Sequence, residues 1–122
     1  MNWMEFVAIT CVVLVPIVIA LRRSRISADE ALERLRNGGV LVDVRSENEF
    51  AAGHLPGAIN LPFDAIATTL PVRVPNKGTV LLLHCESGGR SGEAQTRLRS
   101  MGYTNAFNLG SYTQAAQIVA RR

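Results

Sequence analysis

The residues with the clearest chemical potential lie between Cys85 and Ser91, in the segment HCESGGRS. The cysteine directly follows an apolar run, and Arg90 comes five positions later, just after two glycines. Glycines let a short loop turn its backbone N–H groups toward one point, which makes a site for an anion. The charge of Arg90 and the start of a following helix both favour a thiolate over a thiol. The segment therefore predicts a cysteine nucleophile in an anion-binding loop.

Each residue that follows Cys85 is a candidate member of this site. The backbone N–H groups are expected to point inward and Arg90 to add positive charge, while Ser91 is predicted to cap the next helix and is a candidate hydrogen-bond partner of the sulfur. Glu86 is unusual here, because an acidic side chain at the mouth repels a doubly charged anionic substrate. The predicted loop consists of Glu86, Ser87, Gly88, Gly89, Arg90 and Ser91.

A strand before the loop and a helix after it must hold the cysteine in place. Residues 79–84 are apolar almost throughout, which is typical of a strand buried on both faces of a parallel sheet. Cys85 would then lie at the carboxyl end of that strand, where open α/β sheets bind their ligands. A helix is expected from Ser91 to Met101, ended by Gly102.

The remaining elements alternate along the chain, and this alternation predicts an α/β fold with a parallel sheet. Ser27 and Glu30 form a capping-box pattern that starts the first of these helices. Pro71 and Pro75 are expected to bracket a loop. Further helices are predicted at residues 28–37, 47–52, 64–70 and 114–122, and further strands at 40–44, 58–61 and 105–109.

Asp43 and Arg45 lie at and just beyond the end of the strand at 40–44, at the same predicted sheet edge as Cys85. In one interpretation Arg45 contacts an anionic substrate. In the other, which we favour, Arg45 pairs with Glu49 and Asp43 hydrogen-bonds a neighbouring loop, because charged residues at strand ends usually pair. Both residues are predicted to support the pocket.

The two histidines are predicted to have structural roles. His54 is expected to make a fixed hydrogen bond. The side chain of His84 would point to the opposite face of the strand from Cys85, so it is predicted to pack rather than to act as a base. No set of histidine, cysteine and carboxylate residues has the spacing of metal ligands, and neither a metal nor a cofactor is expected.

The loop CESGGRS resembles the C-x-x-G-x-R-S active-site loop of the single-domain rhodaneses. The segment LVDVRSENEFAAGHLPGAINLP, at residues 41–62, is similar to their other signature, and MGYTNAFNLGS is similar to their closing segment. The resemblance runs from about residue 28 to the C-terminus and is greatest to the phage-shock type. It implies a rhodanese-like domain with a parallel five-stranded sheet flanked by helices.

The resemblance also implies a sulfurtransferase. Cys85 would attack the outer sulfur of thiosulfate or of a persulfide donor, hold it as a persulfide, and pass it to a thiophilic acceptor such as cyanide, a thiol or a protein. Family members active on thiosulfate often carry a basic or neutral residue where this chain has Glu86, which leaves a persulfide donor open. Ser111 and Tyr112 also depart from the family's usual ending.

Two other functions fit parts of the pattern. The first is a small cysteine phosphatase or arsenate reductase of the same fold. Only four residues separate Cys85 from Arg90, whereas cysteine phosphatases have five, and the shorter loop favours a single terminal sulfur over a tetrahedral phosphate. The second is a non-catalytic binding module tethered at a membrane, for which a cysteine and arginine anion site is not needed.

The first part of the chain has a different composition. Residues 3–21 are mostly apolar and carry no charge apart from Glu5. The run is long enough to span a membrane, and three arginines follow before residue 26. We expect residues 1–25 to form a transmembrane anchor with a basic stop-transfer segment, and residues 26–122 to form the rhodanese-like domain. The arginines predict a single pass through the plasma (inner) membrane with the N-terminus outside and the domain in the cytoplasm; export to the periplasm is the alternative.

Charge excludes a nucleic-acid partner. The chain of 122 residues has a formal net charge of +3, but three of its 13 basic residues follow the predicted membrane span. From residue 26 onward ten basic residues face nine acidic ones, without a basic stripe carrying aromatic residues. The expected partners are a small sulfur donor and acceptor, the membrane and a possible protein acceptor.

Overall fold

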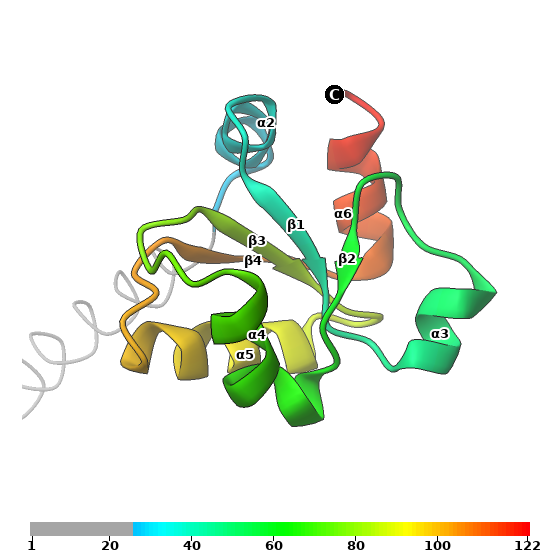
Figure 1. Ribbon diagram of the computed structural model, residues 1–122. Coiled ribbons are helices and arrows are strands. Elements are labelled where there is room, and N and C mark those ends of the chain that lie inside the picture. Colours follow the sequence, from blue (N-terminus) through cyan, green and yellow to red (C-terminus); the bar gives the residue numbers. More distant parts are fainter. Residues whose placement is uncertain (1–25) are drawn as a thin grey trace, which may run out of the picture.

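The computed structural model describes residues 26–122 as a three-layer α/β fold, with a parallel sheet between two pairs of helices (Figure 1). The predicted membrane span and its basic flank lie outside the described residues. Within residues 26–122, no helix is both long and apolar enough to cross a membrane.

The sheet contains four strands in the order β2-β1-β3-β4, and all neighbouring pairs are parallel. The prediction of a parallel sheet is confirmed, but the five strands implied by the resemblance are not found among the described residues. Every other segment there is helix, turn or loop, apart from one isolated bridge between Ser87 and Ser111. The strands are β1 (Val40–Asp43), β2 (Ile59–Asn60), β3 (Leu81–His84) and β4 (Ala106–Gly110).

Helices cover both faces of this sheet. On one face lie α2 and α6, and on the other lie α4 and α5, while α3 stands beside the carboxyl end of β1 (Figure 1). All the predicted helices are present, within a few residues of their expected bounds. They are α2 (Ala28–Arg36), α3 (Glu47–Ala52), the 3₁₀ turn η1 (Phe63–Ala65), α4 (Ile66–Arg73), α5 (Gly89–Ser100) and α6 (Tyr112–Val119).

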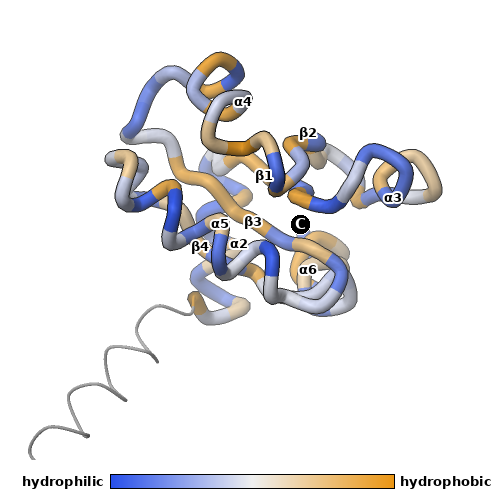
Figure 2. The backbone as a smooth tube through the Cα atoms, turned by 90° about the horizontal axis from the view of Figure 1, so that it is seen from below, coloured by the Kyte–Doolittle hydropathy of each residue, from blue (hydrophilic) through white to orange (hydrophobic). Residues whose placement is uncertain are grey.

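Two hydrophobic clusters, one on each face, hold the layers together. The residues of β3 are fully buried, and β3 is visible as a hydrophobic stretch in the middle of the molecule (Figure 2). Leu81 and Leu83 point into the cluster under α4 and α5, which also contains Cys85, whereas Leu82 points into the cluster under α2 and α6. The alternation along β3 therefore places the sulfur of Cys85 on the α4 and α5 side.

One predicted boundary is wrong. Pro71 lies inside α4, not at the start of a loop, and the helix continues to Arg73. Ile66 and Leu70 are fully buried and anchor α4 on the sheet, and the Leu70 carbonyl accepts a hydrogen bond from the Val74 N–H at 2.7 Å. Packing of these side chains outweighs the backbone hydrogen bond that a proline removes.

Tyr103 ties the end of α5 to the end of α4. Its side chain is fully buried, and its hydroxyl donates to the Val74 carbonyl at 2.8 Å. We expect Tyr103→Phe to lower the free energy of unfolding by about 1 kcal/mol, because the carbonyl loses its buried partner. Tyr112→Phe is the matched control, because that hydroxyl bonds no group within residues 26–122 while its ring packs on Arg45. Equal urea midpoints for the two variants would contradict this assignment.

Candidate active site

The carboxyl ends of three strands meet at one edge of the sheet. Asp43 in β1 is level with His84 in β3, and His84 is level with Gly110 in β4. Cys85 follows β3 directly, and its N–H donates to the Gly110 carbonyl at 3.3 Å. The parallel register therefore brings the cysteine, the first-strand carboxylate and the end of β4 to the same edge.

The sulfur of Cys85 lies inside the loop that follows it. The Gly88 N–H donates to Sγ at 2.9 Å, and the Ser91 Oγ lies 3.4 Å from it. Gly88 has a φ of +98°, and a Cβ there would lie 3.4 Å from the backbone of Gly110. A glycine at this position therefore permits both the left-handed turn and the close approach of the two chain segments.

Opposing effects set the pKa of Cys85. Burial is the largest of them and raises the pKa, because a charged thiolate loses its hydration. A hydrogen bond from the Ser91 hydroxyl lowers the pKa, as do the backbone N–H groups of Ser91, Gly88 and Ser87. The pKa of Cys85 lies below its ordinary value as a result. Hydrogen bonds from the Ser91 hydroxyl and from the loop backbone are thus what favours the thiolate.

Ser91 does not cap α5 as predicted. The helix begins at Gly89 with Gly88 as its N-cap, so Ser91 is already inside the first turn and fully buried. Its Oγ lies 2.7 Å from the Asn108 Oδ1 and also reaches the sulfur. The hydroxyl has a single proton, so it can donate to only one of these partners at a time.

Asn108 is a site residue that the sequence did not reveal. Its Oδ1 accepts from the Ser91 hydroxyl at 2.7 Å and from the Gly110 N–H at 2.8 Å. It therefore links the end of β4 to the first turn of α5. The one available signal was its residue type, because asparagine is unfavourable inside a strand unless its side chain is bonded.

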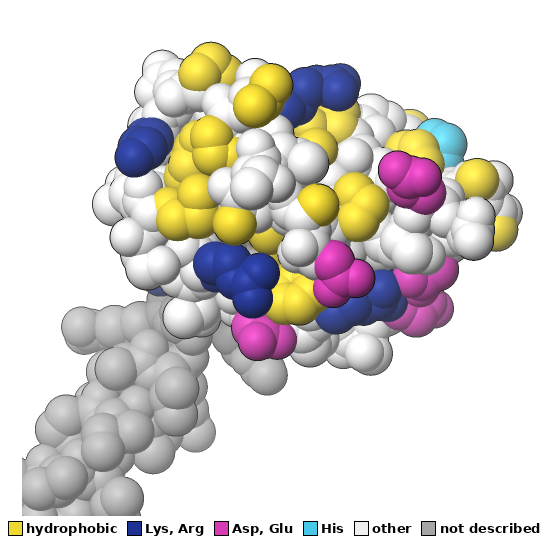
Figure 3. Space-filling model, turned by 60° about the horizontal axis from the view of Figure 1, so that its bottom comes forward, with side chains coloured by type: hydrophobic (Ala, Val, Ile, Leu, Met, Phe, Trp, Pro, Cys, Tyr) yellow, Lys and Arg dark blue, Asp and Glu magenta, His cyan; other side chains and the backbone are white. Residues whose placement is uncertain are grey.

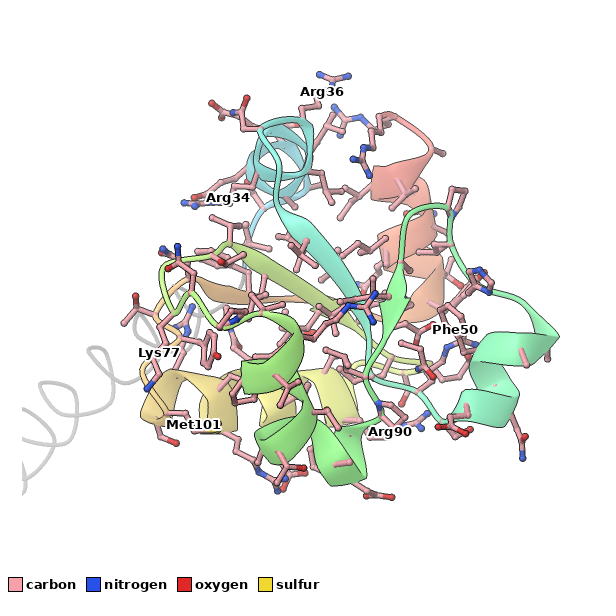
Figure 4. All side chains as sticks on the ribbon, viewed as in Figure 1. Arg34, Arg36, Phe50, Lys77, Arg90 and Met101 are labelled. Carbon is pink, nitrogen blue, oxygen red and sulfur yellow. The ribbon has the colours of Figure 1, made fainter. Side chains whose placement is uncertain are left out.

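Arg90 extends from the start of α5 toward α3 (Figure 4), where it forms a bidentate ion pair with Glu49. The two nitrogen–oxygen distances are 2.7 and 3.1 Å. Arg90 lowers the pKa of Glu49 to about 2, with a further contribution from the backbone N–H of Ser46. Both groups are therefore charged at neutral pH. The prediction that Glu49 pairs with Arg45 is wrong, because the fold brings Arg90 to it instead.

Arg45 binds Asp43 and is buried above the sheet edge. Its Nη2 lies 2.8 Å from the Asp43 Oδ2 and 2.7 Å from the Gly53 carbonyl oxygen, and its guanidinium stacks on the Tyr112 ring at 4.7 Å. The Nη1 lies 3.5 Å from the Glu86 carboxylate. These partners occupy the guanidinium of Arg45, so the geometry favours a structural role over contact with a substrate. The main partner is Asp43 and not the predicted Glu49.

The two histidines lie apart from the sulfur. The ring of His84 is fully buried, its Nδ1 lies 3.3 Å from the Cys85 carbonyl oxygen, and burial lowers its pKa. The Nδ1 of His54 lies 3.0 Å from the Phe50 carbonyl oxygen, and the two rings stack at 3.8 Å. Among the described residues, no hydrogen bond joins either ring to Sγ.

Comparison with known protein families identifies the family. The family model of the rhodanese-like domain matches residues 27–117 of this chain. The chain belongs to the rhodanese-like family. Its enzyme class is that of a rhodanese-type sulfurtransferase. The matched region contains the whole sheet, the Cys85 loop and the first six of the eight residues of α6.

Its relatives include single-domain enzymes. The thiosulfate sulfurtransferase PspE of Escherichia coli (strain K12) is 33% identical over 75 residues, which cover 62% of this chain and 72% of that protein. The thiosulfate:glutathione sulfurtransferase of Saccharomyces cerevisiae is 38% identical over 77 residues, covering 54% and 55%. The structure of the human single-domain sulfurtransferase TSTD1 superposes with a TM-score of 0.67 at 32% identity, covering 76% of this chain and 95% of that one.

Removal of the Ser91 hydroxyl should raise the pKa of Cys85. In Ser91→Ala the thiolate loses a hydrogen bond, so its titration, followed by absorbance near the ultraviolet thiolate band and corrected with Cys85→Ser, should move to higher pH. Ser87→Ala is the matched control, because Ser87 acts on the thiolate through its backbone N–H, which the variant keeps. An unchanged titration in Ser91→Ala would refute the role given to its hydroxyl.

Proposed function

We propose that the chain transfers sulfane sulfur from thiosulfate or a persulfide donor to a thiophilic acceptor through a persulfide on Cys85. The observation that carries this proposal is the hydrogen bond of 2.9 Å from the Gly88 N–H to Sγ, at a cysteine whose pKa is lowered. The same geometry supports a persulfide anion, because backbone N–H groups that stabilise a thiolate also stabilise the sulfur bound to it. Cyanide and small thiols are the proposed acceptors.

The first step forms one S–S bond and breaks another. The Cys85 thiolate attacks the outer sulfur of the donor, and the electron pair of the broken bond leaves with the rest of the donor. With thiosulfate the products are the Cys85 persulfide anion and sulfite. In the second step the acceptor attacks the outer sulfur, and the electron pair returns to Cys85 as a thiolate. No external oxidant or reductant is needed.

The alternative of a small phosphatase or arsenate reductase has less support. A phosphate site needs a loop whose donors surround three equatorial oxygens and an arginine that reaches them. In this loop the Gly88 N–H is directed at the sulfur itself, and Arg90 is engaged by Glu49. A binding module without catalysis would not require the thiolate-stabilising hydrogen bonds around Cys85.

The proposed location is the plasma (inner) membrane, with residues 3–21 as a single-pass anchor and the domain in the cytoplasm. Two sequence features support it, namely the apolar run itself and the three arginines at positions 22, 23 and 25. Cys85 is the one cysteine of the described residues and carries a free thiol, which suits a reducing compartment.

Incubation of the full-length chain with a sulfane-sulfur donor should add one sulfur atom to Cys85, and cyanide should remove it. Intact-mass measurement before and after cyanide tests this directly. Cys85→Ser should abolish the gain, and Cys11→Ser, the matched control, should keep it. If the native chain gains no sulfur from thiosulfate or from an organic persulfide, the proposed function is wrong.

The topology predicts that a fluorescent reporter fused after Arg122 is active and that an export-dependent phosphatase fused there is inactive. Replacement of Arg22, Arg23 and Arg25 by alanine should weaken this preference, because those charges hold the flank in the cytoplasm. Phosphatase activity of the unchanged fusion would reverse the orientation and favour export of the domain to the periplasm.

A further inference from the structure

We propose that the sulfur donor is an organic persulfide and that Glu86 and Glu49 set the preference against the doubly charged donor thiosulfate. This inference rests on the proposed sulfur transfer by Cys85 and specifies its donor. Three features carry it: the charge state of the two arginines beside the loop, the exposed carboxylate of Glu86, and a cavity beside Arg90.

Both arginines that border the loop are neutralised by carboxylates. Arg90 is held by Glu49 through two hydrogen bonds, so this pair has no net charge. Arg45 contacts two carboxylates, those of Asp43 at 2.8 Å and Glu86 at 3.5 Å, so this cluster has one net negative charge. On the face that carries α4 and α5, acidic and basic side chains lie beside one another and do not form a positive patch (Figure 3).

Glu86 places a negative charge at the mouth of the site. It is the residue next to Cys85, and its side chain is 62% exposed, so its charge repels a doubly charged donor near the loop. The Gly88 N–H stabilises one anionic sulfur at Cys85, but it lies inside the loop. The sulfonate group of thiosulfate carries its charge away from the reacting sulfur and would remain outside that hydrogen bond. A donor with one charge or none avoids this repulsion.

A cavity of about 380 Å³ lies beside Arg90 and offers space for an organic group. It is on the same side of the sheet as the sulfur, because Val44 lines it and shares a buried cluster with Cys85. Its size falls in the range of small-molecule pockets. Apolar walls come from Val44, Pro62 and Phe63, and further negative charge comes from Glu47 and Asp64.

These features fit a persulfide better than thiosulfate. In the transfer, the Cys85 thiolate attacks the terminal sulfur of R–S–SH and forms a new S–S bond, so that Cys85 becomes Cys–S–SH. The S–S bond of the donor breaks, and its electron pair leaves with the thiolate R–S⁻. The leaving thiolate then takes a proton from water. The cavity beside Arg90 has space for the organic group R, which thiosulfate lacks, and a donor without a second negative charge is repelled less by Glu86.

The test compares donors that differ by one charge. Thiosulfate is a dianion, whereas methanethiosulfonate has a methyl group in place of one charged oxygen and is a monoanion. Glu86→Gln should raise the ratio of kcat/KM for thiosulfate to that for methanethiosulfonate about fivefold, the effect of one charge near a surface. Glu49→Gln should raise it in the same direction by freeing Arg90. Glu33→Gln is the matched control, because Glu33 is an exposed residue of α2 at the other end of the sheet.

Two independent measurements vary the ionic strength and the size of the cavity beside Arg90. In the native chain the same ratio should rise with ionic strength, and in Glu86→Gln it should rise less, because salt screens the repulsion. Benzenethiosulfonate fills more of the cavity than methanethiosulfonate does. Ala65→Phe, at an exposed position that lines the cavity, should raise KM for the benzene compound and leave KM for the methane compound unchanged.

The outcomes separate the donor class from the proposed function. Freshly generated 2-hydroxyethyl persulfide should load Cys85 of the native chain with a higher kcat/KM than thiosulfate. A ratio unaffected by both glutamate variants, or thiosulfate as the better donor, would overturn the inference while leaving sulfur transfer intact. If no donor places sulfur on Cys85, the proposed function itself fails.

Discussion

The site depends on the hydrogen bond of 2.9 Å from the Gly88 N–H to the Cys85 sulfur. To form it, the chain must turn through a left-handed residue directly above the end of β4, where a Cβ on Gly88 would lie 3.4 Å from the Gly110 backbone. Gly110 is equally constrained, because a Cβ there would overlap the Gln114 side chain, whose oxygen caps α6 by accepting from the Ser111 N–H. The loop, the end of β4 and the start of α6 are thus positioned together, and a side chain at either glycine disturbs all three.

Charge at the same edge of the sheet is arranged in pairs. Asp43 is fully buried and would be costly as an isolated anion, but Arg45 compensates it by donating from Nε to Oδ1 and from Nη2 to Oδ2. Arg45 is in turn packed on Tyr112, so a buried ion pair and an aromatic ring fill the space between β1 and α6. Glu49 and Arg90 form the second pair and join α3 to α5 across the mouth of the loop. The arginines therefore hold the elements around Cys85 in place, and the direct contacts with the sulfur come from the Gly88 N–H and the Ser91 hydroxyl.

The sequence predicted the elements and the place of Cys85 at the end of a central strand, but not the partners of the charged side chains. Local patterns determine a buried run such as Leu81–His84 or a glycine turn after Cys85, and the structure has both. Which charged side chains pair depends on the distances between them, and the tertiary fold determines these distances. Four residues separate Arg45 from Glu49, which suggested a pair, but the turn at Ser46 starts α3 in a direction that presents Glu49 to Arg90, 41 residues away. Asn108 was missed for the same reason, since its partner Ser91 lies on another element.

Burial and hydrogen bonding act on Cys85 in opposite directions, and both serve a nucleophile. A thiolate stabilised only by hydrogen bonds and charge becomes less nucleophilic as its pKa falls. Here desolvation raises the pKa and hydrogen bonds lower it, so burial offsets part of the stabilisation that the hydrogen bonds give to the thiolate. Ser91 adds a further adjustment, because its single proton is shared between the sulfur and Asn108. In the sulfur transfer proposed above, the hydroxyl can donate to Asn108 while Cys85 is a thiol and to the sulfur once Cys85 is an anion. The proposed gain and release of a sulfur atom at Cys85 requires stabilisation that changes with the charge on the sulfur, and a hydroxyl that can reach two acceptors meets that requirement.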